Sequence, residues 1–155
     1  MQMQYMELIE DKTNLGMTFW DAGSNINLVR SDFVERLGSV GRPCVQNIQV
    51  SGHPMEPWQT KAHWVTMVSK ASEEFLILAF EVEKITTAVD RVDVTPILDL
   101  FPGLTYEEVY RPMGEVDLLV GIQEASLHPT VSERSVIDNL RLLDSKFGTG
   151  KLLDG

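Results

Sequence analysis

The sequence predicts an all-β protein with two or three short helices, and three observations support this fold class. Several short runs alternate polar and apolar side chains or are rich in Val, Ile and Phe, as strands are. Clusters of Gly, Pro, Asn and Asp separate these runs, as turns do. Helical spacing is confined to brief segments. At 155 residues the chain is expected to form one domain, covering 1–155, with its own core.

The composition narrows the class of partner. Hydrophobic residues make up 43% and charged residues 23%, which is typical of a soluble globular protein. Thirteen basic and twenty-three acidic residues give a net charge of -10, which argues against binding to nucleic acid or anionic membrane. We therefore expect a polypeptide partner. No leader or membrane-spanning pattern is present and Cys44 is the only cysteine, so we expect a cytoplasmic location.

The first half of the chain is predicted to hold five strands and one helix, the strands lying at 5–10, 15–20, 25–29, 45–50 and 58–70. The helix is expected at 32–37, with Ser31 as its N-cap and Gly38 at its C-terminal end. In the last strand the alternation places His63, Val65 and Met67 on one face and Trp64 on the other. Residues 38–43 are expected to form a loop.

The second half begins with a nearly continuous apolar run at 75–82. It predicts a central strand buried on both faces, although a helix is not excluded by its period. Residues 87–102 are expected to be irregular. Further elements are predicted in this order: a helical turn at 105–108, a strand at 116–120, a helix at 122–128, and short strands at 139–147 and 151–153, with a turn at 148–150.

One acidic residue, Asp21, stands between two apolar runs in the stretch FWDAGSNINLV at 19–29. The arrangement predicts a carboxylate at the tip of a strand-turn-strand unit. As an isolated motif, Asp-Ala-Gly-Ser is more often an ordinary turn than a catalytic one. A functional interpretation therefore depends on what else in the chain accompanies it.

Three segments together resemble the retropepsin-like aspartic proteases. Residues 19–29 and the helix after them resemble the active-site segment of that family. The run VDLLVGIQ at 116–123 resembles the segment before the C-terminal helix, and LLDSKFG at 142–148 resembles the end of the peptidase in Bel/Pao retrotransposon polyproteins. These matches extend in the family's order from about Leu15 to the end of the chain.

The resemblance implies a closed retropepsin-like barrel with a flap hairpin at about 45–68, acting as a homodimeric aspartic endopeptidase without metal or cofactor. Each subunit would donate one catalytic Asp21. Two carboxylates at short range share a proton, so one acts as a base on water and the other as an acid towards the scissile carbonyl. The source would be a Bel/Pao-type retroelement or a host protein derived from one.

The resemblance also implies which residues contact the peptide substrate. The flap tip would close over the peptide and exclude water, Gly23 would offer its carbonyl, and Leu119 would line the pocket. The implied contact residues come from the turn, the flap tip and the later strand: Ala22, Gly23, Ser24, Asn25, Val50, Ser51, Gly52, His53 and Leu119.

The chain departs from the family's pattern at three positions. Ala22 replaces the Thr or Ser whose hydroxyl bonds across the dimer, and each lost bond is worth about 0.5–1.5 kcal/mol. Ile122 replaces an Arg that forms an ion pair in retroviral relatives, and Gln123 replaces an Asp or Asn. An alternative function is therefore a catalytically inactive retropepsin-fold module for dimerisation or peptide binding.

Other chemistries find little support in the sequence. The three histidines, His53, His63 and His128, are too widely spaced for a metal motif. The run GTGK at 148–151 lacks the first glycine and the final Ser or Thr of a phosphate loop. No Gly-x-Ser-x-Gly elbow is present, so a serine hydrolase is not expected.

Overall fold

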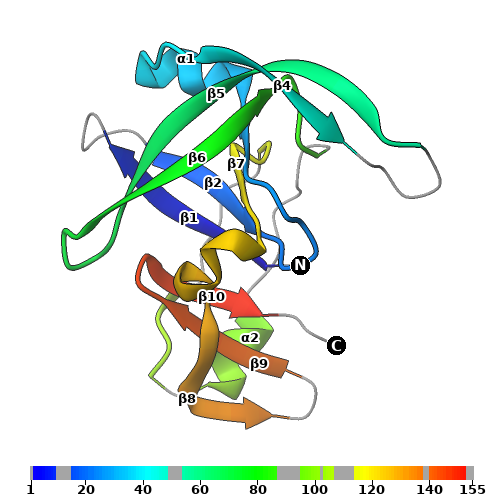
Figure 1. Cartoon of the computed structure of the whole chain (residues 1–155). Helices are drawn as coiled ribbons and strands as arrows, with labels where there is room; N and C mark the ends of the chain where they lie inside the picture. The colour runs from blue at the N-terminus through cyan, green and yellow to red at the C-terminus, as the bar shows by residue number, and fades with distance from the viewer. Residues whose placement is uncertain are drawn as a thin grey trace.

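The computed structural model describes residues 2–9, 15–48, 54–86, 95–101, 103–106, 114–137 and 140–152 (Figure 1). The strands are β1 (Gln2–Ile9), β2 (Leu15–Trp20), β3 (Leu28–Arg30), β4 (Arg42–Ile48), β5 (Glu56–Val68), β6 (Glu74–Val82), β7 (Leu118–Val120), β8 (Thr130–Ile137), β9 (Leu140–Ser145) and β10 (Gly148–Leu152). The helices are α1 (Ser31–Leu37), α2 (Thr95–Leu100) and the 3-10 helix η1 (Ile122–Leu127).

Most of the strands form one mixed seven-stranded sheet with the order β1-β2-β7-β3-β6-β5-β4. β7 lies between β2, to which it is parallel, and β3, to which it is antiparallel. β1 also pairs with β5 over three residue pairs from Glu7↔Val68 to Ile9↔Thr66. β4 pairs with β5 and is the last strand of this order among the described residues. The all-β class with few helices is thus confirmed, whereas the closed retropepsin-like barrel and its flap stay predictions.

A second, three-stranded sheet holds β8, β9 and β10 in antiparallel order. Figure 1 shows it below the large sheet, with the golden η1 segment between the two. Phe147, in the turn between β9 and β10, stacks on Trp20 at the end of β2, with ring centroids 5.8 Å apart. The C-terminal sheet therefore packs, through Phe147, against the strand that precedes Asp21.

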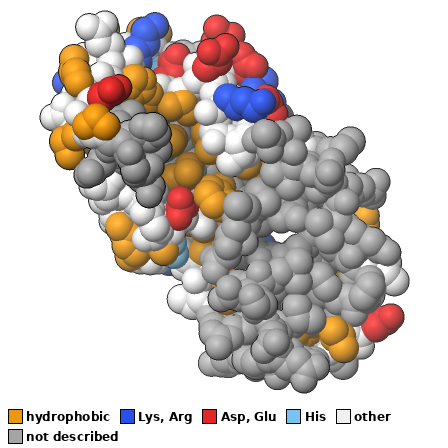
Figure 2. All heavy atoms as spheres, turned by 90° about the vertical axis from the view of Figure 1, so that its right-hand side faces the viewer, with side chains coloured by type: hydrophobic (Ala, Val, Ile, Leu, Met, Phe, Trp, Pro, Cys, Tyr) orange, Lys and Arg blue, Asp and Glu red, His pale blue; other side chains and the backbone are white. Residues whose placement is uncertain are grey.

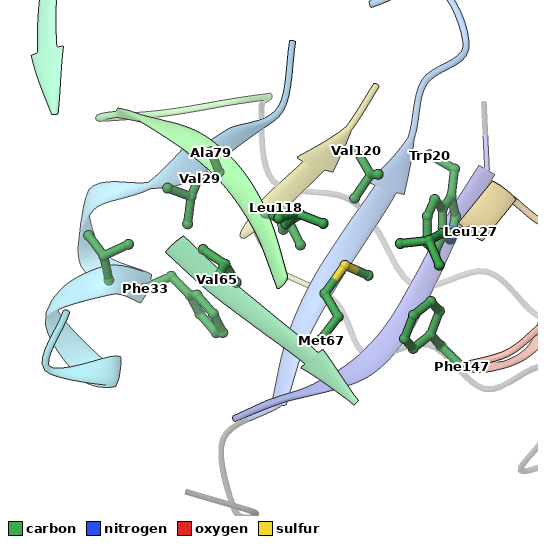
Figure 3. Packing of buried hydrophobic residues seen from close by; sticks show 12 residues of the cluster. Trp20, Val29, Phe33, Val65, Met67, Ala79, Leu118, Val120, Leu127 and Phe147 are labelled. Atoms are coloured by element: carbon green, nitrogen blue, oxygen red, sulfur yellow. The ribbon is translucent and has the colours of Figure 1, made fainter. Parts of the chain in front are cut away.

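The main core is formed by residues of the large sheet, α1, η1 and the turn between β9 and β10 (Figure 3). Phe33 of α1 and Val29 of β3 are fully buried in the same cluster as Val65 and Met67 of β5. Figure 3 shows Phe33 directed at Val65, and Met67 lying between that pair and Phe147. Burying apolar surface stabilises by about 25 cal/mol per Å², so this cluster stabilises the position of β3, through Val29.

Several predicted elements are confirmed. β2 has the predicted bounds, and α1 ends at Gly38, whose φ of 70° is the left-handed conformation that glycine adopts without strain. In β5, His63, Val65 and Met67 are buried while Trp64 is 61% exposed, as the alternation predicts. These successes share a cause, because each depends on short-range pattern alone.

The helix start was predicted wrongly. The N-cap residue of α1 is Arg30, and Ser31 lies inside the helix. The Ser31 hydroxyl bonds Glu81 Oε2 and the Val82 carbonyl, both at 3.1 Å. The Ser31 hydroxyl was expected to bond the helix backbone, but it bonds β6 instead.

The strand prediction at 75–82 was wrong about burial. In β6, Ile77 and Ala79 are buried, but Leu76 is 59% exposed. α1 and the core cover one face of the sheet, and antiparallel sheets often leave the other face to solvent. Residues 25–27 precede β3 and do not belong to it, so only the end of the strand expected at 25–29 is confirmed.

Corrections in the remaining chain concern elements with weak local signals. Arg42 and Pro43 belong to β4, not to a loop, and α2 lies in the stretch expected to be irregular. β8 was not predicted, and 122–127 is a 3-10 helix. Residues 148–150 begin β10, because the turn is at Lys146 and Phe147. Residues 49–53 and 107–113 lie outside the described residues. They include the predicted flap tip and half of the helical turn predicted at 105–108.

Candidate active site

Asp21 follows β2 directly, and backbone bonds fix the turn that it begins. Its N–H donates to the Val120 carbonyl at 2.9 Å, so the position of the turn depends on β7. The Gly23 N–H donates to Asp21 Oδ1 at 2.9 Å, and the Ser24 N–H donates to the Asp21 carbonyl at 3.2 Å. Asp21 is half-buried, while Ala22 and Gly23 are exposed. The turn therefore presents an oriented carboxylate at the surface.

Gly121, just after β7, supports the turn from behind. A Cβ at this position would lie 2.6 Å from the Ile26 carbonyl oxygen and 2.7 Å from that of Ser24, closer than real contacts allow. The next residue, Ile122, donates its N–H to the Ser24 carbonyl at 2.8 Å. Only glycine lets β7 approach the turn this closely.

Asn27 connects the turn to three other elements. Its side chain is buried, and Oδ1 accepts the Gly121 N–H at 2.8 Å. Its Nδ2 donates to the Leu78 carbonyl of β6 at 3.0 Å and lies 3.5 Å from Glu124 Oε1 of η1. One amide thereby pairs with the backbone of β6 and with the backbone just after β7. It fixes the spacing of these two strands beside Asp21.

His128 holds the other side of Gly121. Its Nε2 lies 2.8 Å from the Gly121 carbonyl oxygen, and its ring packs edge-on to Trp20 with centroids 5.2 Å apart. The Nε2 nitrogen must therefore carry the hydrogen in this contact. Trp20, immediately before Asp21, is itself 3% exposed, so the strand leading to the carboxylate is firmly packed.

Charged side chains join the far ends of β3 and β7. Arg30 Nη2 donates to Asp117 Oδ1 at 2.7 Å and its Nε donates to the same oxygen at 3.2 Å. Asp117 Oδ2 accepts the Met17 N–H of β2 at 2.9 Å. Burial lowers the pKa of Arg30, but Asp117, through its hydrogen bond and charge, and the charges of Glu115 and Asp32 outweigh that effect and raise it. Arg30 therefore stays charged, and Asp117 has its own partners.

The structure brings part of the predicted substrate-contact set together. Ala22, Gly23 and Asn25 are exposed, whereas the Ser24 hydroxyl bonds back to the Ile26 carbonyl at 2.8 Å. Leu119 pairs with Phe19 of β2 and Leu28 of β3, so it is next to the turn, but it is 7% exposed in a small apolar cluster. Val50, Ser51, Gly52 and His53 lie outside the described residues.

Two hollows lie beside the β4–β5 hairpin. One, of about 710 Å³, is lined by residues of both strands, the start of α1 and the end of β6. The other, of about 560 Å³, lies between the outer side of the hairpin, β6 and the loop after α1. The lining of neither hollow includes Asp21.

A separate polar cluster lies at the base of the hairpin. Ser39 Oγ is 2.9 Å from His63 Nδ1, and His63 Nε2 is 2.7 Å from Glu81 Oε1. The His63 side chain is only 1% exposed, and a Cβ on Gly41 would lie 2.6 Å from Nε2. The cluster thus joins the loop before β4 to β5 and β6, so His63 has a structural role here.

The described residues contain no group of three His, Cys, Asp or Glu side chains placed to hold a metal ion. In the same part of the chain, no helix has the length and apolar character needed to cross a membrane. Comparison of this chain with protein-family models, curated proteins and solved structures found no match.

Sequence reasoning missed three residues that organise this site: Asn27, Arg30 and Asp117. A signal for Asn27 was present, because it alternates with Ile26 and Leu28 and so falls on the same face as the apolar Val29. Polar side chains on buried faces need partners. The pairing of Arg30 with Asp117 spans 87 positions and leaves no comparable local pattern.

Proposed function

We propose that this chain is an aspartic endopeptidase of the retropepsin type, active as a homodimer with one Asp21 from each copy. The observation that carries the proposal is the Asp21 turn: its carboxylate is oriented by the Gly23 N–H and presented at the surface. β7 and Gly121 support the turn from behind. Acid-base chemistry on a peptide bond requires such pre-organised groups.

A second carboxylate is needed, and a second copy is its best source. Asp117, which lies near the same strands, is 6% exposed and bonded to Arg30 and to the Met17 backbone, so it is not available to substrate. Two copies of Asp21 facing each other would share one proton. One carboxylate then takes a proton from the attacking water, while the other donates a proton to the carbonyl oxygen.

The strand connections favour a retropepsin-like barrel as the scaffold. The pairings run from β1 through β2, β7, β3, β6 and β5, and β1 pairs again with β5. β4 and the first part of β5 form a hairpin that projects from this body in Figure 1. We assign this hairpin the role of a flap that covers an extended polypeptide substrate and binds its backbone as a strand would. The two carboxylates activate the attacking water, so the proposed reaction needs no cofactor.

The test compares the native chain with Asp21→Asn in a peptide-library cleavage assay at mildly acidic pH. The amide cannot exchange the required proton, so we expect cleavage to fall by at least about 100-fold. Asp99→Asn is the matched control, because Asp99 is an exposed carboxylate on α2. Equal cleavage by native chain and Asp21→Asn would contradict the proposal.

The second candidate is an inactive dimerisation or peptide-binding module from a Bel/Pao-type retroelement, and Ala22 favours it. Ala22 is exposed beside the carboxylate and has no hydroxyl to bond across a dimer. If the chain is such a module, the native chain cleaves no peptide at any concentration. Asp21→Asn then leaves self-association or peptide binding unchanged.

A further inference from the structure

The segments that form the Asp21 turn and support it from behind contain few charged residues. In segments 15–29 and 118–123, which include β2, the Asp21 turn and β7, Asp21 is the only charged residue, although 23% of the whole chain is charged. Figure 2 views the side on which the turn lies in Figure 1. Hydrophobic side chains are spread over its described part, and most of the charged ones gather along the upper edge.

Ile122, in the second of these two segments, is a large hydrophobic residue at the surface. It is 46% exposed, at the start of η1. Its backbone N–H donates to the Ser24 carbonyl at 2.8 Å, which joins the residue to the turn. Ala22 is exposed on the same turn. Two apolar side chains therefore accompany Asp21 at the surface.

A two-fold contact makes a particular demand on such a surface. The same patch is used by both copies, so a residue near the axis meets its own counterpart. A charged side chain there would meet an identical charge, which costs free energy, whereas an apolar one gains from burial. Each copy carries a net charge of -10, so two copies approach with less repulsion through segments whose one charged residue is Asp21.

We propose that Ile122, together with Ala22, packs against the same residues of a second copy and holds the two Asp21 turns together. This inference rests on the proposed homodimer, but it assigns the contact to particular side chains. The partner is another copy of this chain. An apolar contact replaces the hydroxyl bond that Ala22 cannot make.

The experiment is sedimentation equilibrium of the full chain carrying Asp21→Asn, so that self-cleavage does not interfere. We expect Ile122→Glu to raise the dimer dissociation constant at least about tenfold, because the new charge faces its own copy. Ile122→Leu keeps an apolar side chain and should change it less than about threefold. Circular dichroism and thermal melting of each variant establish that it is folded.

Val40→Glu is the matched charge control. Val40 is 94% exposed in the loop after α1, and the substitution changes net charge by the same amount. Equal weakening by Val40→Glu and Ile122→Glu would overturn the inference, since charge and not contact would then be responsible. An unchanged dimer in folded Ile122→Glu would overturn it too.

The outcomes also separate this inference from the proposed function. Cleavage by the native chain with an unchanged dimer in Ile122→Glu refutes the contact and leaves the protease. A native dimer that Ile122→Glu dissociates, but that cleaves no peptide, supports the contact and refutes the protease. A native chain that stays monomeric at high micromolar concentration refutes both.

Discussion

The amide of Asn27 is placed where a single side chain determines the geometry next to Asp21. Its Oδ1 accepts the Gly121 N–H and its Nδ2 donates to the Leu78 carbonyl. One of these backbone groups is in the middle of β6 and the other follows β7, and water reaches them poorly because Gly121 is buried and Asn27 is 2% exposed. Without the amide they would be left unpaired, and each unpaired buried group costs about 1–3 kcal/mol.

We therefore expect Asn27→Ala to lower the free energy of unfolding by about 2–5 kcal/mol. Chemical denaturation measures the change. Asn25→Ala is the matched control, since Asn25 is exposed two residues away and its loss should cost no more than about 0.5 kcal/mol. Similar values for the two variants would show that the Asn27 bonds do not stabilise the turn.

Among the elements, β2, β3 and β7 depend on the Arg30–Asp117 pair at the end opposite to the turn. Removing one member of a buried ion pair leaves the other without compensation, which costs about 3–5 kcal/mol. Arg30 retains Glu115 and Asp32 as partners, but both are more exposed than Asp117, whose side chain is 9% exposed.

Asp117→Ala should accordingly destabilise the fold by about 3 kcal/mol or more, as measured by denaturant unfolding. Asp32→Ala removes a carboxylate that contacts the same guanidinium at 2.9 Å but is 76% exposed, so its cost should stay below about 1 kcal/mol. If Asp117→Ala were no worse than Asp32→Ala, the pair would contribute little to holding these strands.

Elements with strong local patterns were predictable from the sequence, and those defined by distant partners were not. β2, α1 and β5 carry alternation, helical spacing or a terminal glycine in their own residues. β7 was predicted as a strand, but its position between β2 and β3 was not. A strand of only three residues carries no pattern that indicates which strands it pairs with. Asp21 was identified by its turn, whereas Asn27 and Asp117 acquire their roles only through contacts made across the fold.

For the molecule as a whole, the strength of self-association decides whether the proposed active site exists at a given concentration. Ala22→Thr restores a hydroxyl that can bond across the two-fold axis, in two copies per dimer. At about 0.5–1.5 kcal/mol for each bond, dimer affinity should rise by roughly tenfold or more. Cleavage at low protein concentration should rise with it.

Sedimentation and peptide cleavage measure these effects. Ala125→Thr serves as the control, because Ala125 is exposed on η1 and its substitution adds the same hydroxyl outside the turn. Equal affinity of native chain and Ala22→Thr would indicate that the two copies are held together through other surfaces.

The insertion of β7 between β2 and β3 also governs the order of events during synthesis. Asp21 and the strand before it leave the ribosome early, but the residues that hold the turn, Val120 and Gly121, follow about a hundred positions later. Contacts of such long range form late, after the intervening chain is available. A nascent chain that has not yet reached β7 therefore carries Asp21 without its supporting frame. The proposed protease would therefore cleave no polypeptide until most of its own domain had been translated.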